Sequence, residues 1–62
     1  IVMAHNHPSG IALPSDQDIA ITEQVKIALS NIGVRLVDHI IIADNDYISL
    51  YQTNKYKYIF SD

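Results

Sequence analysis

The sequence predicts an α/β fold in which a strand, a helix and a second strand form a crossover, and a short third strand returns as a hairpin. Two segments rich in β-branched or apolar residues, 1–7 and 35–43, flank a segment with helical spacing of apolar residues, 15–32. An Asp-Asn-Asp turn at 44–46 then precedes another β-rich segment, 47–51. This order favours a right-handed crossover between parallel strands, with an antiparallel strand added at its end.

The first strand, residues 1–7, is short and mostly apolar. Pro8 has no backbone N–H and favours an extended residue before it, so the strand is expected to end there. Ser9 and Gly10 then permit a turn. We therefore expect residues 8–15 to form the loop that leads into the helix.

The helix is expected to begin at Ser15, because a serine hydroxyl caps helix N-termini well. Asp16 and Asp18 follow in the first turn, where the helix dipole favours negative charge. Gly33 suits the C′ position that ends the helix. The apolar residues at helical spacing, which we expect to face the core, are Ile21, Val25, Ala28, Leu29 and Ile32.

The β-branched residues of 35–43 predict a buried strand, and residues 47–51 predict its antiparallel partner. The tail, residues 52–62, alternates lysine and tyrosine and is compatible with a short edge strand or a loop. Because the 62-residue chain opens directly on an apolar strand, we expect it to be the C-terminal part of a single larger domain. An exposed first strand also favours edge pairing, and so a homo-oligomer.

The composition argues against several classes of function. The chain has no cysteine, which excludes disulfides and thiolate metal sites and suits a reducing, cytoplasmic setting. Its formal net charge is −3 and its four basic residues form no long run, so direct nucleic-acid binding by this segment is not expected. No apolar run reaches the length of a membrane span, so no membrane partner is expected.

Two histidines one residue apart, His5 and His7, carry the strongest chemical signal. On a strand both side chains point to one face, roughly 6.5–7 Å apart, and imidazole is the commonest metal-binding side chain. Asp18 adds a carboxylate from the start of the helix. Two nitrogens and one oxygen leave a fourth position for water, as in catalytic zinc sites. Helix capping with Ser15 is an alternative role for Asp18, and the two roles are compatible.

His-x-His, seven intervening residues and Ser-x-x-Asp together resemble the JAMM motif of the MPN metalloprotease superfamily. More narrowly, the segments at 5–10, 14–15 and 38–42, together with Ser49, resemble the RadC-like branch. This resemblance covers residues 2–50. It implies a cytidine-deaminase-like (JAB/MPN) fold and a zinc ion held by His5, His7 and Asp18. It also implies a catalytic role for Ser15, as a hydrogen-bond donor near the reacting oxygen.

The resemblance implies a zinc-dependent hydrolase of the metallopeptidase type, which cleaves a peptide or isopeptide amide of a peptide or protein substrate with zinc-activated water. The general base of the family is a glutamate on an earlier element, which we expect this segment to lack. Glu23, the one glutamate present, lies five residues past Asp18 and so points roughly 140° away around the helix. We therefore expect this segment to bind zinc weakly and to hydrolyse nothing.

Other interpretations stay open at this point. A RadC-like accessory protein in DNA repair or DNA metabolism, without hydrolase activity, is the main alternative function. A site with two histidines and one carboxylate can also hold iron, although most such enzymes are all-β. Asp38 and His39 are either a polar pair near a strand end, satisfied by the backbone or by each other, or His39 lines the metal site behind its ligands.

Overall fold

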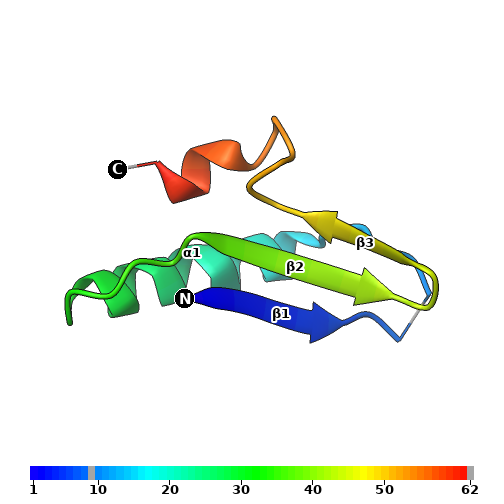
Figure 1. Cartoon of the computed structure of the whole chain (residues 1–62), viewed down its shortest axis with the longest axis horizontal. Helices are drawn as coiled ribbons and strands as arrows, with labels where there is room; N and C mark the ends of the chain where they lie inside the picture. The colour runs from blue at the N-terminus through cyan, green and yellow to red at the C-terminus, as the bar shows by residue number, and fades with distance from the viewer. Residues whose placement is uncertain (9, 62) are drawn as a thin grey trace.

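The computed structural model describes residues 1–8 and 10–61, so Ser9 of the predicted turn lies outside the described residues. The described part contains a three-stranded sheet with a long α-helix on one face and a short 3-10 helix near the C-terminus (Figure 1). The elements, in chain order, are β1 (Val2–Asn6), α1 (Asp16–Ser30), β2 (Asp38–Ala43), β3 (Asp46–Ser49) and η1 (Lys57–Phe60). The predicted strand–helix–strand crossover with a hairpin is confirmed.

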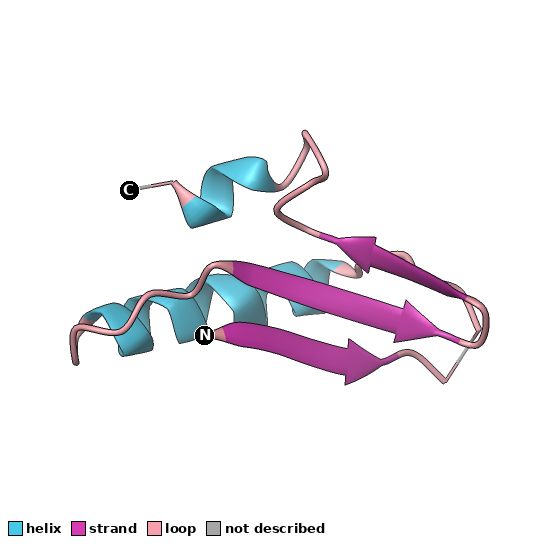
Figure 2. Ribbon diagram, in the orientation of Figure 1, coloured by secondary structure: helices cyan, strands magenta, loops and turns pink. Residues whose placement is uncertain are grey.

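β2 is the central strand of the sheet (Figure 2). It pairs in parallel with β1 and antiparallel with β3. In the parallel register Met3 lies opposite His39 and His5 opposite Ile41. Because side chains alternate between faces along a strand, these four residues point toward α1, while Asp38 points to the other face.

Both ends of α1 are capped as the sequence predicts. The Ser15 hydroxyl accepts a hydrogen bond from the Asp18 N–H (3.1 Å), and the Asp18 carboxylate accepts one from the Ser15 N–H (2.8 Å), which completes a capping box. Gly33 adopts a φ of 75° beyond the last turn, a backbone conformation that favours glycine. Its N–H donates to the Ser30 carbonyl and the next N–H, of Val34, donates to Leu29, as in a Schellman motif.

The predicted core face of the helix is only partly right. Ile21 and Ile32 are 43% and 73% exposed, and Ala28 is also exposed. The helix face that is turned inward carries Ile19, Thr22, Val25 and Leu29. Thr22 is fully buried at the centre of this face. Since a threonine does not count as apolar, the periodicity alone centres the face on the wrong residues.

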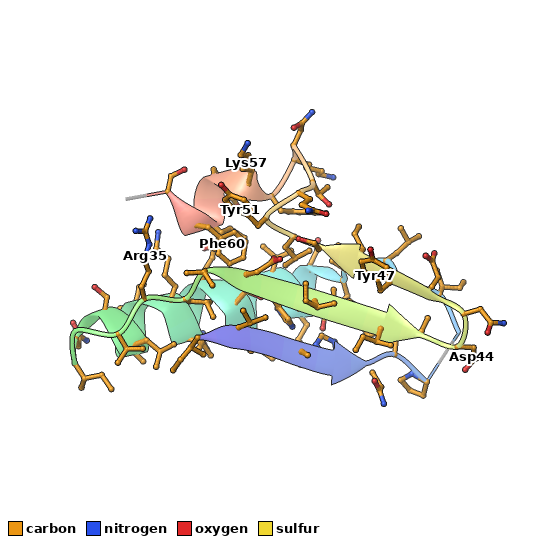
Figure 3. All side chains as sticks on the ribbon, in the orientation of Figure 1. Arg35, Asp44, Tyr47, Tyr51, Lys57 and Phe60 are labelled. Carbon is orange, nitrogen blue, oxygen red and sulfur yellow. The ribbon has the colours of Figure 1, made fainter. Side chains whose placement is uncertain are left out.

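The described part of the tail, residues 52–61, forms no edge strand: it begins with a series of turns over residues 52–56 and continues as η1, which lies near the start of β2 (Figure 1). The ring of Tyr51 meets Phe60 edge-on, with 6.2 Å between centroids, and Lys57 lies over the Tyr51 ring (Figure 3). The buried apolar cluster consists of Leu36, Ile41, Leu50, Ile59 and Phe60. No helix in the described ranges is long and apolar enough to cross a bilayer.

Candidate metal centre

The end of β1 and the first turn of α1 bring His5, His7 and Asp18 together. His5 lies on β1 and points toward α1, and His7 follows β1 directly, with its N–H donating to the Ile42 carbonyl (2.8 Å). Asp18 occupies the third position of α1. Each of the three offers a ligand atom within 4.8 Å of the other two, and within residues 1–8 and 10–61 they form the one such group. The group can hold a metal ion.

Each imidazole faces a different oxygen of the Asp18 carboxylate. His7 Nε2 lies 2.8 Å from Oδ2, and His5 Nε2 lies 3.3 Å from Oδ1. The two rings are tilted by 49° with centroids 4.9 Å apart. A tetrahedral zinc ion with bonds of about 2.0–2.2 Å separates its ligand atoms by roughly 3.3 Å. The distance from His5 to Asp18 matches this spacing, and the 2.8 Å from His7 to Asp18 would have to widen slightly.

The hydrogen bond at Nδ1 of His7 indicates whether Nε2, the ring nitrogen that faces Asp18, has a free lone pair. His7 Nδ1 lies 3.2 Å from the Ile11 carbonyl oxygen. A carbonyl only accepts, so Nδ1 carries the hydrogen, and Nε2 of the neutral ring has a free lone pair. That lone pair faces a carboxylate oxygen at 2.8 Å. Because Asp18 Oδ2 also only accepts, the contact needs either a proton on Nε2, which makes it the hydrogen bond to Asp18, or a cation in place of that proton, which fits a metal site.

The pKa of the Asp18 carboxyl reflects opposing effects. Burial by itself raises this pKa, but contacts with the backbone and side chain of Ser15, the hydrogen bond to His7 and the charge of His5 outweigh it. The net result is a pKa below the ordinary value of 3.8. Asp18 is therefore ionised at neutral pH, as a metal ligand must be.

His39 lies directly behind His5. It is 1% exposed, and its Nε2 lies 2.8 Å from His5 Nδ1 while its Nδ1 lies 2.6 Å from the Thr22 hydroxyl. Burial, followed by the charge of His5, lowers the pKa of His39 despite the opposing charges of Asp18 and Asp38. Of the two roles that the sequence left open, the polar-pair interpretation describes Asp38, whereas the His39 ring contacts a proposed ligand.

Sequence reasoning missed two parts of this cluster, the Thr22 hydroxyl and the Ile11 carbonyl. Thr22 lies four residues after Asp18, on the same side of the helix, and this spacing is a signal that could have found it. No pattern marks the Ile11 carbonyl, which depends on the path of the loop. Glu23 accepts a hydrogen bond from the Tyr58 hydroxyl (3.0 Å), on the side of α1 that faces η1.

Comparison with known proteins identifies the family. A model of the RadC-like JAB domain matches residues 1–56. The chain belongs to the RadC-like JAB domain family. This confirms the predicted resemblance to the RadC-like branch of the JAMM/MPN superfamily and the predicted fold class.

Three bacterial relatives illustrate the similarity. A UPF0758 protein of Legionella pneumophila (strain Lens) is 48% identical over 56 residues, which are 90% of this chain and 25% of the relative. A UPF0758 protein of Marinomonas sp. (strain MWYL1) is 52% identical over 50 residues, 81% of this chain and 22% of the relative. One from Actinobacillus pleuropneumoniae serotype 5b (strain L20) is 47% identical over 49 residues, 79% and 22% respectively. This RadC-like JAB chain thus spans about a quarter of the length of the relatives it matches.

Proposed function

We propose that this chain carries the zinc-binding residues of a JAMM-type hydrolase that cleaves a peptide or isopeptide amide. The observation that supports this most directly is the convergence of His5 Nε2, His7 Nε2 and the Asp18 carboxylate. The other ring nitrogen of each histidine, Nδ1, makes a hydrogen bond directed away from the site. Zinc, when bound by these residues, polarises a carbonyl and lowers the pKa of water to about 7.

Ser15 is suited to stabilise the negative charge that develops on the substrate oxygen. Capping uses a lone pair of its hydroxyl, which accepts from the Asp18 N–H, so the hydroxyl hydrogen stays free to donate. Ser15 is exposed and stands at the N-terminus of α1, where the helix dipole favours negative charge. A donor of this kind contributes most when it is already oriented before the reaction.

We propose that the general base comes from outside the described residues. Glu23 is held by Tyr58 on the side of α1 that faces η1, and Asp38 points to the opposite face of the sheet. A positioned base typically contributes about 10²- to 10⁴-fold in rate. We therefore propose that the 62-residue chain binds zinc without measurable hydrolysis.

Zinc titration by calorimetry tests the site. His7→Ala removes one of three proposed ligands, and we expect zinc affinity to fall by more than the 10- to 100-fold that is roughly typical of an outer-shell loss. Asn6→Ala is the matched control, because Asn6 lies between the two histidines but on the opposite face of β1. Equal affinity in the parent and His7→Ala would rule out the site. Metal analysis of protein purified without added metal distinguishes zinc from iron.

A further inference from the structure

We propose that Thr22 and His39 are positioning residues that hold His5 in the tautomer with its hydrogen on Nδ1, so that the Nε2 lone pair faces Asp18. They form a buried relay, Thr22–His39–His5, that joins α1, β2 and β1. The tautomer assignment stands on hydrogen-bond geometry alone, and its effect on metal affinity rests on the proposed function.

The relay has a direction because Thr22 has only one hydroxyl hydrogen. Thr22 Oγ1 lies 2.7 Å from the Asp18 carbonyl oxygen, which can only accept, so the hydroxyl hydrogen points there. The same oxygen lies 2.6 Å from His39 Nδ1. Its remaining capacity is to accept, and His39 Nδ1 therefore donates to it.

The direction passes through His39 to His5. The His39 ring is 1% exposed, and burial away from water disfavours a charged imidazole, so the ring is taken as neutral and carries one N–H. With that hydrogen on Nδ1, His39 Nε2 is an acceptor. His5 Nδ1, 2.8 Å away, must then be the donor. The neutral His5 ring is left with its lone pair on Nε2, the atom 3.3 Å from Asp18 Oδ1.

The same contacts also position the ligands relative to one another. The Thr22 hydroxyl bonds to the backbone of Asp18, and His39 bonds to His5, so the relay links the helix that carries the carboxylate to the strand that carries the imidazole. Thr22 and His39 are almost completely buried, where hydrogen bonds are stronger and unpaired groups are costly. The opposite tautomer of His5 would place two lone pairs against each other at His39 across 2.8 Å, a closer contact than the 3.3 Å between His5 Nε2 and Asp18 Oδ1.

The tautomers can be measured directly in the metal-free parent chain. Long-range proton–nitrogen NMR of the ¹⁵N-labelled chain identifies which ring nitrogens of His5 and His39 carry a hydrogen. We expect hydrogen on Nδ1 of both His5 and His39. Hydrogen on Nε2 of His5 in the parent overturns the proposal, and this measurement requires no variant to fold.

Thr22→Val tests the relay itself. Without the hydroxyl, His39 loses its acceptor and can move its hydrogen to Nε2, which forces the His5 hydrogen onto the nitrogen that faces Asp18. We expect this shift in the NMR spectrum and a fall in zinc affinity of about 10- to 100-fold, as for other outer-shell partners. Thr22→Ser retains the hydroxyl and is expected to restore both.

Thr53→Val is the matched control, since the Thr53 hydroxyl also donates to a carbonyl four residues earlier, that of Ser49 (2.8 Å), away from the site. It is expected to change neither the His5 tautomer nor zinc affinity. An unchanged tautomer in folded Thr22→Val overturns the relay. If the parent shows the expected tautomers but binds no zinc, the proposed function fails and the tautomer assignment stands.

Discussion

Asp38 and His39 are neighbours on β2, yet they build polar clusters of different kinds on opposite faces of the sheet. The Asp38 carboxylate accepts from the His39 N–H (2.7 Å), the Ser49 hydroxyl (2.6 Å) and the Tyr51 N–H (3.0 Å). All these partners belong to the β2–β3 hairpin and the residues directly after it. The His39 ring instead reaches Thr22 on α1 and His5 on β1.

The two clusters differ in where their hydrogen bonds end. Around Asp38 every bond runs from a donor to an acceptor of the hairpin, so the cluster stabilises that hairpin. The hydrogen bonds that pass through the His39 ring lead to His5, whose Nε2 is an acceptor in the proposed tautomer. This atom faces Oδ1 of Asp18, which is also an acceptor. A polar network becomes a candidate metal site when it ends in hydrogen-bond acceptors that face one another without a donor between them. Residue type alone does not distinguish the two cases.

Removal of the Asp38 carboxylate gives the largest expected change in stability. Asp38→Ala leaves the Ser49 hydroxyl and two backbone N–H groups without their acceptor, and we expect the free energy of unfolding to fall by about 2–4 kcal/mol. This is a large share of the roughly 3–9 kcal/mol expected for a chain of this size. Urea unfolding measures the loss.

The milder variant Ser49→Ala removes the hydroxyl that donates to Asp38, and about 1 kcal/mol of stability is expected to be lost. Because these bonds stay within the hairpin, zinc affinity of the folded Ser49→Ala chain is expected to match the parent. A fall in affinity comparable to that of His7→Ala would show that the two clusters are not independent.

Ser15→Ala is expected to have a smaller effect and to separate capping from ligand positioning. Loss of the cap is expected to lower the free energy of unfolding by about 1 kcal/mol, and Ser15→Gly by only a few tenths. Zinc affinity is expected to change little, because Asp18 Oδ2 is held by the Ser15 backbone N–H, which both variants retain. Urea unfolding with calorimetry measures both quantities. A large loss of affinity would instead assign the hydroxyl to the positioning of Asp18.

The pH dependence of stability is the smallest expected effect. The pKa of His39 is lowered from 6.5, first by burial, so the unfolded chain binds the proton more readily and stability falls as pH drops below about 6.5. The pKa of Asp18 is lowered from 3.8, so its contribution is present above that value and is lost as pH falls through the folded pKa. Urea unfolding of the metal-free chain between about pH 8 and 3 measures both changes.

His39→Gln separates the histidine contribution in this experiment. Glutamine at that position does not titrate, so the variant is expected to lose less stability than the parent between about pH 7 and 5. The same loss in both chains would contradict the assignment of that step to His39.

The local features of this chain follow from its sequence because their partners are close along the chain. The capping box needs only Ser15 and Asp18, three residues apart, and the hairpin forms around a short turn between β2 and β3. The grouping of His5 and His7 with Asp18 depends on strand alternation and on the first turn of a helix, both readable as spacing. The JAMM motif, from His5 to Asp18, lies within this same local range, whereas the narrower RadC-like resemblance also uses residues 38–42 and Ser49.

Only the tertiary structure decided which polar side chains meet at long range. His39 is 34 residues from His5 and 17 from Thr22, and their contacts depend on the parallel register of β1 and β2 and on the rotation of α1 over the sheet. Periodicity could not predict that rotation, because the buried centre of the helix face is Thr22 rather than an apolar residue. It also could not predict η1, whose Ile59 and Phe60 are buried in the same apolar cluster as Leu36 and Ile41.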